Sequence, residues 1–418
     1  MTLLRSWIDS ANAPDCAFPL NNLPCGVFSV QGDSPRCGVA IGDFILDVSA
    51  LEEEGLLQLG GHPVLDVPFW NELMELGPDA WADFRAQVAA FLNEGSPKRA
   101  LAEDHLMPLA DAVLHMPFLV SEYTDFYAGR HHAFNVGSMF RDPENALPPN
   151  WLHIPIGYNG RASSVVVSGT DVRRPLGQLK PPGADVPHFG PSKRFDFELE
   201  MGAVVGQASE GMVSVEQAEA MIFGYVLLND WSARDIQAWE YQPLGPFQAK
   251  ATATTISPWI VMAAALQPFR VATPPREVPL LPYLTEPRPM LYDVQLEVAL
   301  QPEGGPETVL TRTRYGEMYY SAPQQLCHHT TSGCPMNVGD LLGSGTISGP
   351  GKAERGSLLE LSWGGKEPVA ITGGSRSFIE DGDTVTLRGH AQGDGYRIGF
   401  GDCAGRLLPA PALPDWAR

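Results

Sequence analysis

The chain has 418 residues, which is long for one compact core and predicts two domains. Its net charge of −21 (28 basic against 49 acidic side chains) disfavours nucleic acids and anionic membranes as partners. An anionic substrate would therefore need a local positive field from Arg, Lys or a metal ion. The 43 Gly and 38 Pro favour short strands and many turns over long helices.

Cysteine usage and apolar segments bear on the compartment. The 6 cysteines are too sparse for a disulfide framework. Arg5 and Asp9 interrupt the apolar core that a signal peptide requires, and the most apolar window, residues 259–266, is too short to span a bilayer. We therefore expect a cytoplasmic protein. Cys327 and Cys334 flank two histidines, but their spacing is not that of a usual zinc site.

The first part of the chain has the pattern of a separate β domain. Short β-type runs at 26–30, 37–41 and 44–48 are separated by Gly, Asp and Pro, which predicts a small barrel or sandwich. Helical periodicity follows over residues 79–102. With a boundary near Pro117, we expect domains at 1–117 and 118–418.

The second part is predicted to be mainly β with few helices, an α+β chain overall. Ser214 and Gln217 form a capping-box pattern, which predicts a helix start. The apolar run 223–228 predicts a buried strand that ends at Asp230, and residues 232–240 predict a short helix.

The run Phe195–Met201 carries the most informative pattern. In an extended strand the side chains alternate between faces, so Asp196, Glu198 and Glu200 would share one face. Neighbouring like charges repel. The pattern therefore indicates either a solvated polar face or a divalent-cation site, in which the ion's charge cancels the repulsion.

Two more carboxylates follow in positions typical of functional groups. Asp125 lies just beyond the predicted boundary, and Asp230 ends a predicted strand. Each has a purely structural alternative, since Asp125 suits a turn and Asp230 suits a helix cap. Hard oxygen ligands favour Mg²⁺ or Ca²⁺ over zinc, with Mn²⁺ also accepted.

Several segments in the second part match the sequence motifs of a known family. Together they resemble the fumarylacetoacetate hydrolase family, and the resemblance covers nearly everything from about 115 to 410. The segments are Tyr123-Thr-Asp-Phe-Tyr127, Asn150-Trp-Leu-His153, Gly157-Tyr-Asn-Gly-Arg-Ala-Ser-Ser164, Phe195-Asp-Phe-Glu-Leu-Glu200, Asn229-Asp-Trp-Ser-Ala-Arg-Asp-Ile-Gln237 and Gly345-Thr-Ile-Ser-Gly-Pro350. The first 115 residues match loosely, and His131 stands where the family is expected to have Gln.

The resemblance implies a role for each matching residue. The divalent ion would be held by Asp125, Glu198, Glu200 and Asp230, with Lys250 and Thr254 beside it. His132 would be the general base, held by Glu360. Negative charge would be stabilised by Arg234, Gln237 and Lys250. The substrate contacts would be Tyr127, Arg141, Tyr158, Gln237, Tyr241 and Thr346.

The resemblance also implies an SH3-like N-terminal β-barrel, a C-terminal mixed β-roll and a homodimer. The implied activity is metal-dependent hydrolysis of a carbon–carbon bond in 4-fumarylacetoacetate, in tyrosine and phenylalanine catabolism. Two alternatives stay open: another activity of the same superfamily, such as that of an acylpyruvate hydrolase or the decarboxylation of a related oxo-acid, or a β-roll that binds metal without catalysis.

Three of these residues also have structural interpretations. His132 could be a buried histidine with satisfied hydrogen bonds. Arg234 could merely pair with Asp230 or Asp235 on its own helix. Glu360 lies between two leucines in what we expect to be an apolar strand, where a buried charge needs a partner.

Overall fold

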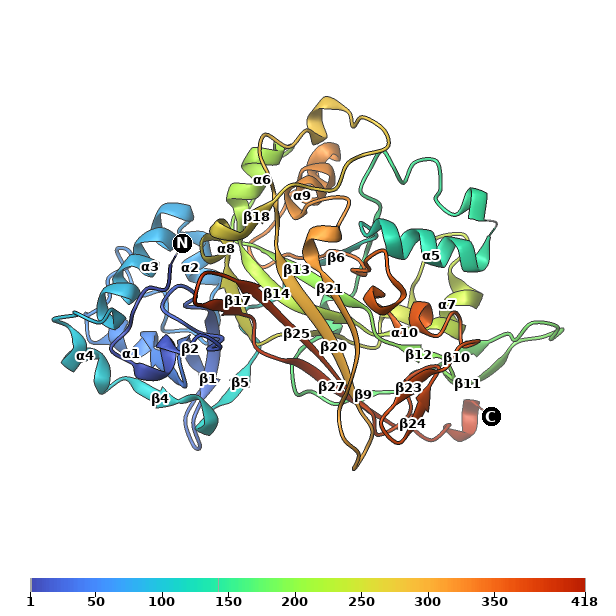
Figure 1. Ribbon diagram of the computed structural model, residues 1–418, viewed down its shortest axis with the longest axis horizontal. Helices are drawn as coiled ribbons and strands as arrows, with labels where there is room; N and C mark the ends of the chain where they lie inside the picture. Colours follow the sequence, from blue (N-terminus) through green and yellow to red (C-terminus); the bar gives the residue numbers. More distant parts are fainter. Residues whose placement is uncertain (1, 142, 418) are drawn as a thin grey trace.

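The structure is a computed structural model that describes residues 2–141 and 143–417. It is mainly β with mixed sheets, as the sequence predicts. The N-terminal part forms the blue lobe on the left of Figure 1, and the rest of the chain forms the larger body on the right. That the N-terminal lobe is SH3-like remains a prediction.

The N-terminal lobe combines short strands with a layer of helices. Its strands are β1 (Cys25–Ser29), β2 (Arg36–Ile41), β3 (Phe44–Asp47), β4 (Leu106–Pro108) and β5 (Val113–His115). Its helices are α1 (Val48–Glu53), α2 (Asn71–Glu75), α3 (Pro78–Leu92) and α4 (Arg99–Glu103). The helical stretch predicted over 79–102 is thus two helices, because Gly95 and Pro97 fall in the segment between them.

One large sheet runs from this lobe into the body. Strand β1 pairs with β17, so the order continues as β4-β3-β2-β1-β17-β14-β13-β22-β6-β7, with β16 and β8 attached at β14. The strands of the body are β6 (Tyr123–Phe126), β7 (Gly157–Asn159), β8 (Val165–Val167), β13 (Leu199–Val205), β14 (Ile222–Asp230), β16 (Thr254–Ile256), β17 (Trp259–Met262) and β22 (Leu341–Gly343).

A second sheet packs on the first. It contains β9 (Val172–Arg173), β20 (Val294–Gln301), β21 (Thr308–Arg314), β25 (Thr384–Gln392), β26 (Arg397–Gly399) and β27 (Cys403–Leu408). In Figure 1, β20 and β25 cross in front of β13 and β14. One buried core joins Tyr225 and Leu227 of the first sheet to Val298 and Leu387 of the second. The strands that carry the acidic residues are therefore held from behind by a packed apolar layer.

Four two-stranded ribbons complete the described strands. They pair β10 (Leu176–Leu179) with β11 (His188–Pro191), β12 (Phe195–Asp196) with β15 (Ser232–Ala233), β18 (Arg270–Val271) with β19 (Leu291–Tyr292), and β23 (Val369–Ile371) with β24 (Gly374–Arg376).

The helices of the body are short. They are α5 (Arg130–Phe140), α6 (Val215–Met221), α7 (Arg234–Glu240), α8 (Ala263–Leu266), α9 (Ala322–His329) and α10 (Leu358–Leu361). The predicted capping box is confirmed, with Ser214 and Gln217 bonded reciprocally at the start of α6. The helix predicted over 232–240 begins two residues later, because Ser232 and Ala233 form β15. Among the described helices, none combines the length and apolar character that a membrane crossing requires.

Candidate active site

The acidic run that dominated the sequence pattern is not a single strand. Residues Phe195–Asp196 pair in β12, Leu199–Val205 pair in β13, and Phe197 and Glu198 lie between the two. The alternation of faces survives this break, but every residue of the run is buried. The interpretation as a solvated polar face is therefore wrong, and a buried face with three carboxylates needs compensating charge.

Four carboxylates converge among the inner strands of the large sheet. One oxygen each from Asp125, Glu198, Glu200 and Asp230 lies within 4.8 Å of the others, and all four residues are buried. Asp125 comes from β6, Glu200 from β13 and Asp230 from the end of β14, so pairing within the sheet sets their positions. The structural alternatives for the two aspartates are not needed, since both lie within strands.

Strand β22 leaves room for this cluster. Its last residue, Gly343, pairs with Asp125, and a Cβ atom there would come within 2.8 Å of Asp125 Oδ1 and 3.0 Å of Glu200 Oε2. Any larger residue would push the carboxylates apart. The glycine therefore makes space for the cluster at the centre of the sheet.

The four carboxylates of the cluster outnumber the two cations beside them, Lys250 and Arg234. Burial raises the pKa of Glu200 well above its usual value, and the nearby carboxylates of Asp125 and Asp230 raise it further. Burial also raises the pKa of Asp125 and that of Asp230, against the opposing effect of Lys250. Glu198 differs, because Arg234 and Lys250 outweigh burial and hold its pKa well below its usual value.

The buried atoms around the cluster fit a divalent cation. Lys250 Nζ donates to Glu198 Oε2 and to Asp230 Oδ2, each at 2.5 Å. Four further oxygens are buried without a hydrogen-bond partner: Asp125 Oδ1, Glu200 Oε1, Asp230 Oδ1 and Thr254 Oγ1. Unpaired buried oxygens are costly, and a hard cation satisfies several of them at once. The acidic cluster can therefore bind a divalent metal.

His132 lies at the edge of this cluster. On α5, its Nδ1 is 2.6 Å from Glu360 Oε2, while its Nε2 points toward Glu198 and lies 3.9 Å from Oε1. Glu360 is fully buried and also accepts hydrogen bonds from Asn135, Ser348 and Ser357. Burial opposes its ionisation, but His132, Asn135 and Ser357 outweigh that effect and lower the pKa of Glu360. The arrangement orients the ring and leaves Nε2 free to take a proton.

The expected secondary structure around Glu360 is wrong. Glu360 lies in the short helix α10, not in a strand, and Ser357 caps that helix by accepting from the Glu360 N–H. The sequence contains the signal, since Ser357-Leu-Leu-Glu360 has the Ser-x-x-Glu spacing of a capping box. The leucines on both sides of Glu360 instead led to the prediction of an apolar strand.

Arg234 faces the cluster, although one of its hydrogen bonds goes to Gln237 on its own helix. Its Nη1 lies 2.6 Å from Glu198 Oε1 and donates to Gln237 Oε1 at 3.2 Å, while its Nε donates to Asp196 Oδ2 at 2.8 Å. The expected alternative pairing with Asp230 or Asp235 is therefore wrong. Its remaining nitrogen, Nη2, is buried without a partner. A buried donor with nothing to bind suits a ligand that carries negative charge.

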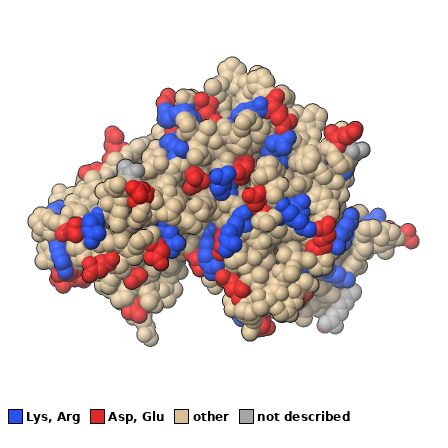
Figure 2. Space-filling model, in the orientation of Figure 1, with Lys and Arg blue, Asp and Glu red and all other residues tan. Residues whose placement is uncertain are grey.

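The local positive field comes from the interior. Figure 2 shows acidic and basic side chains interspersed over the visible face of the molecule. Arg234 and Lys250, in contrast, are 7% and 6% exposed and sit directly on the carboxylates. Burial disfavours their charge, but the neighbouring carboxylates outweigh it and raise the pKa of both groups.

Only some of the residues expected to contact the substrate lie beside His132 and the acidic cluster. Tyr127 packs edge-on against His132 with ring centroids 5.5 Å apart, and Tyr158 OH lies 3.5 Å from Asp230 Oδ2. Thr346 is buried with an unpaired hydroxyl, directly after the Gly345 N–H that donates to Glu200. Two expected contacts lie further out: Arg141 is exposed and donates to the Ala146 carbonyl, and Tyr241 is 43% exposed.

Sequence reasoning missed several groups that hold the site. Asn135, Ser348 and Ser357 surround Glu360, yet small polar residues carry no distinctive pattern. The role of Asp196 was also missed. Its carboxylate bonds Arg234 and α10, two elements far apart in the sequence.

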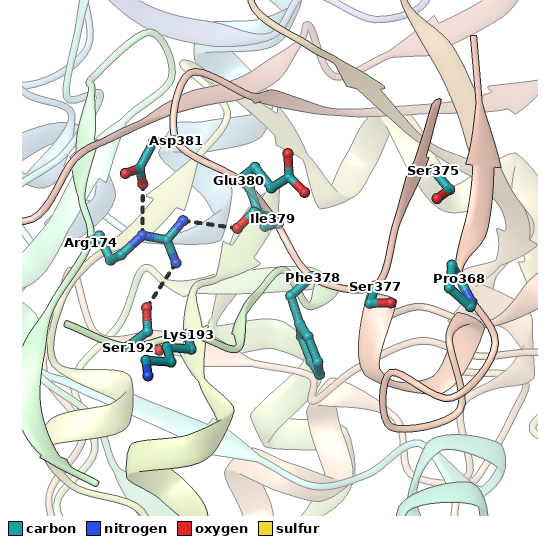
Figure 3. Close-up of a pocket in the computed structure, with 10 residues that line it drawn as sticks. All are labelled: Arg174, Ser192, Lys193, Pro368, Ser375, Ser377, Phe378, Ile379, Glu380 and Asp381. Carbon is teal, nitrogen blue, oxygen red and sulfur yellow. Dashed lines mark hydrogen bonds and ion pairs between the residues drawn. The ribbon is translucent and has the colours of Figure 1, made fainter. Parts of the chain in front are cut away.

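Two other places in the structure, the cysteine pair and a surface cavity, lack the features of an active site. Within the described residues, the acidic cluster is the one group of His, Cys, Asp and Glu with metal-site spacing, so Cys327 and Cys334 form no such site. A separate open cavity of about 570 Å³ has a lining, drawn in Figure 3, that contains none of the predicted site residues. Its Arg174 is already bonded to Asp381 and to two backbone carbonyls.

Comparison with known proteins accounts for both parts of the chain. Residues 122–407 match the model described as fumarylacetoacetate (FAA) hydrolase C-terminal, and residues 21–117 match fumarylacetoacetase N-terminal. The chain is 47% identical over 422 residues to a fumarylacetoacetase from Arabidopsis thaliana, covering 98% of this chain and 100% of that protein. It is 48% identical over 409 residues to the fumarylacetoacetase of Homo sapiens, covering 95% and 98%.

Among solved structures, the fold is similar to a fumarylacetoacetate hydrolase from the psychrophilic Exiguobacterium antarcticum. The TM-score is 0.54 at 16% identity, with 93% of this chain and 99% of that chain covered. This likeness concerns the fold, while the family rests on the matches to both parts of the chain. The chain therefore belongs to the fumarylacetoacetate hydrolase family.

Proposed function

We propose that this protein hydrolyses the carbon–carbon bond of 4-fumarylacetoacetate to give fumarate and acetoacetate, in tyrosine and phenylalanine catabolism. Relatives named fumarylacetoacetase match nearly its full length at 44–49% identity. The observation that carries the proposal is the position of His132 between Glu360 and Glu198. It puts a candidate base for water directly beside a candidate metal centre, which a decarboxylase or a silent metal-binding β-roll would not need.

The bond that breaks defines what the site must do. Water adds its oxygen to the carbonyl carbon next to the fumaryl double bond, and one of its protons goes to a base. The bond from that carbon to the neighbouring CH₂ then breaks, and its electron pair leaves as the enolate of acetoacetate. The enolate takes up a proton. Stabilising the negative charge on two oxygens is the main difficulty.

The chain's own residues suit these steps. His132 Nε2 would take the proton from water, while Glu360 holds Nδ1–H and stabilises the imidazolium. Arg234 Nη2, which has no partner in the protein, would donate to the developing oxyanion together with Gln237 and Lys250. The imidazolium could then return its proton to the leaving enolate.

Asp125, Glu198, Glu200 and Asp230 would hold the metal ion, with Lys250 and Thr254 at its side. We propose Mg²⁺ or Ca²⁺, with Mn²⁺ also compatible, because the donors are all oxygens. When bound, the ion supplies positive charge to the diketone oxygens. Tyr127, Tyr158 and Thr346 line this region, and Arg141 and Tyr241 would reach the substrate's carboxylates from the rim.

The direct test is the loss of the diketone absorbance of 4-fumarylacetoacetate with purified protein. We expect turnover that yields fumarate, disappears with a chelator and returns with Mg²⁺ or Ca²⁺. Turnover of simple acylpyruvates without turnover of fumarylacetoacetate would favour the other diketo-acid hydrolases. Metal binding without turnover of any diketo acid would favour the silent β-roll.

We further propose a homodimer. An exposed apolar surface follows α7, where Leu244 is 95% and Phe247 is 69% exposed, beside the partly exposed Trp239 and Tyr241. Apolar side chains concentrated in this way usually mark an interface. Sedimentation equilibrium is expected to give twice the mass of one chain, and the double variant L244S/F247S should weaken the association. V113S changes an exposed apolar residue of the N-terminal lobe and serves as its control. A monomeric wild type would contradict the proposal.

A further inference from the structure

One carboxylate beside the active site has no part in the steps above, yet it accepts four hydrogen bonds. Asp196, in β12, is 0% exposed. Its Oδ2 accepts from Arg234 Nε at 2.8 Å and from the Leu359 N–H at 3.0 Å. Its Oδ1 accepts from the Leu358 N–H at 2.8 Å and from the Phe197 N–H at 2.9 Å. All of its partners are donors, so the site requires an ionised carboxylate.

The partners of Asp196 belong to the two halves of the proposed chemistry. Arg234 begins α7 and carries the unpaired Nη2 that would meet the oxyanion. Leu358 and Leu359 form the first turn of α10, and the next residue, Glu360, holds His132. Figure 1 shows α7 and α10 side by side next to β12, although more than a hundred residues separate them in the chain. A single side chain thus ties the oxyanion donor to the helix behind the base.

The position of Arg234 depends on this contact. Its Nη1 is drawn to Glu198, a member of the acidic cluster, at 2.6 Å. Without a second anion at Nε, the guanidinium would be free to rotate toward the cluster and away from the place where Nη2 now points. Two anions at two edges fix the plane of the group, because the guanidinium is rigid and presents its donors in a fixed fork.

We propose that Asp196 is a positioning residue with two effects. It orients the Arg234 guanidinium toward the developing oxyanion, and it fixes the position of α10, whose Glu360 holds His132. This inference rests on the proposed hydrolysis. Asp196 lies behind Arg234 and contacts neither His132 nor the unpaired oxygens of the cluster, so it is not a catalytic residue. Its loss should slow the chemical step and leave substrate binding nearly unchanged, since oxyanion contacts form only in the transition state.

The first test is D196N, which keeps the shape but replaces one acceptor oxygen by a donor. We expect kcat to fall about 10²-fold, as for loss of one oxyanion donor, with KM changed less than about threefold. The matched control is D235N. Asp235 is the next residue of α7 and bonds Ser192 and the Lys193 N–H, but neither Arg234's side chain nor α10. Its kcat should stay within about threefold of wild type.

A double-mutant cycle separates positioning from general damage. If Asp196 acts through Arg234, D196N should add less than about tenfold to the loss already caused by R234Q. For the other arm, the proton between His132 and Glu360 should give a downfield NMR resonance, which D196N should shift or broaden. D196E is made in parallel, so that a buried negative charge is retained if D196N does not fold. It should show the same fall in kcat, because its longer side chain displaces both partners.

Three outcomes would overturn the inference: kcat within about threefold of wild type in folded D196N or D196E, losses that multiply in the cycle, or an effect on KM alone. An inactive wild-type enzyme would instead refute the proposed hydrolysis. In that case the NMR resonance still tests whether Asp196 positions the His132–Glu360 pair.

Discussion

H132A is expected to lower turnover of 4-fumarylacetoacetate by about 10³-fold or more, within the range known for loss of a general base. The reason is geometric: His132 Nε2 is the imidazole nitrogen that faces the carboxylate cluster, while Nδ1 is fixed on Glu360. Metal binding should persist, because Nε2 is 3.9 Å from Glu198 and the four carboxylates are untouched. Steady-state kinetics and calorimetric titration with Mg²⁺ measure the two effects separately.

The same variant should remain folded, although less stable. Glu360 keeps hydrogen bonds from Asn135, Ser348 and Ser357, but it loses the hydrogen bond from His132 Nδ1, which should cost about 1–3 kcal/mol. H131A is the matched control, since His131 faces Glu317 and not the cluster. Its turnover should stay near that of wild type. Near-normal turnover of H132A, or an equal loss in H131A, would exclude His132 as the base.

E200Q is expected to weaken binding of Mg²⁺ or Ca²⁺ by about 10²-fold or more, and turnover with it, because it removes a charged ligand. In the metal-free protein the same change should be stabilising. Glu200 is buried against Asp125 and Asp230, and both burial and these charges raise its pKa. A neutral amide relieves that repulsion. Metal-free E200Q should therefore melt at a higher temperature than metal-free wild type.

Thermal unfolding with and without Mg²⁺ tests both predictions in one experiment: the higher melting temperature of metal-free E200Q and its smaller stabilisation by the metal. At a Mg²⁺ concentration of about 100 times the wild-type Kd, bound metal adds about 2.7 kcal/mol to the wild type, and E200Q should lose most of this. E53Q, at the exposed end of α1, removes the same charge far from the cluster and should change neither curve appreciably. Unchanged metal affinity in E200Q would remove Glu200 from the ligand set.

Part of the site was readable from the sequence because its geometry is local. The alternation of Asp196, Glu198 and Glu200 follows from the two-residue period of a strand and survived the break at Phe197. The capping box of α6 follows from residues three positions apart. The family resemblance added residues such as His132 and Glu360, whose roles no local pattern indicates.

Local patterns failed where burial decided the outcome. The leucines around Glu360 suggested an apolar strand, yet the segment is a capped helical turn whose acid points inward to His132. Arg234 has the acids Asp230 and Asp235 close to it in sequence, yet it pairs with Asp196 and Glu198. In both cases the contact that forms is buried and its partner is distant in the chain, because a buried polar or charged group without a partner would be costly.

The sequence by itself determined the mainly β class, the family and the residue types of a hard-cation site, since these depend on period, composition and motif. Tertiary structure alone decided that the four carboxylates lie within 4.8 Å of one another, that Gly343 leaves room for them, and that Asp196 joins α7 to α10. Apart from the neighbours Glu198 and Glu200, these contacts link residues 30 or more positions apart. Chain spacing carries no information at that range, so the register of the sheet and the packing behind it set the distances.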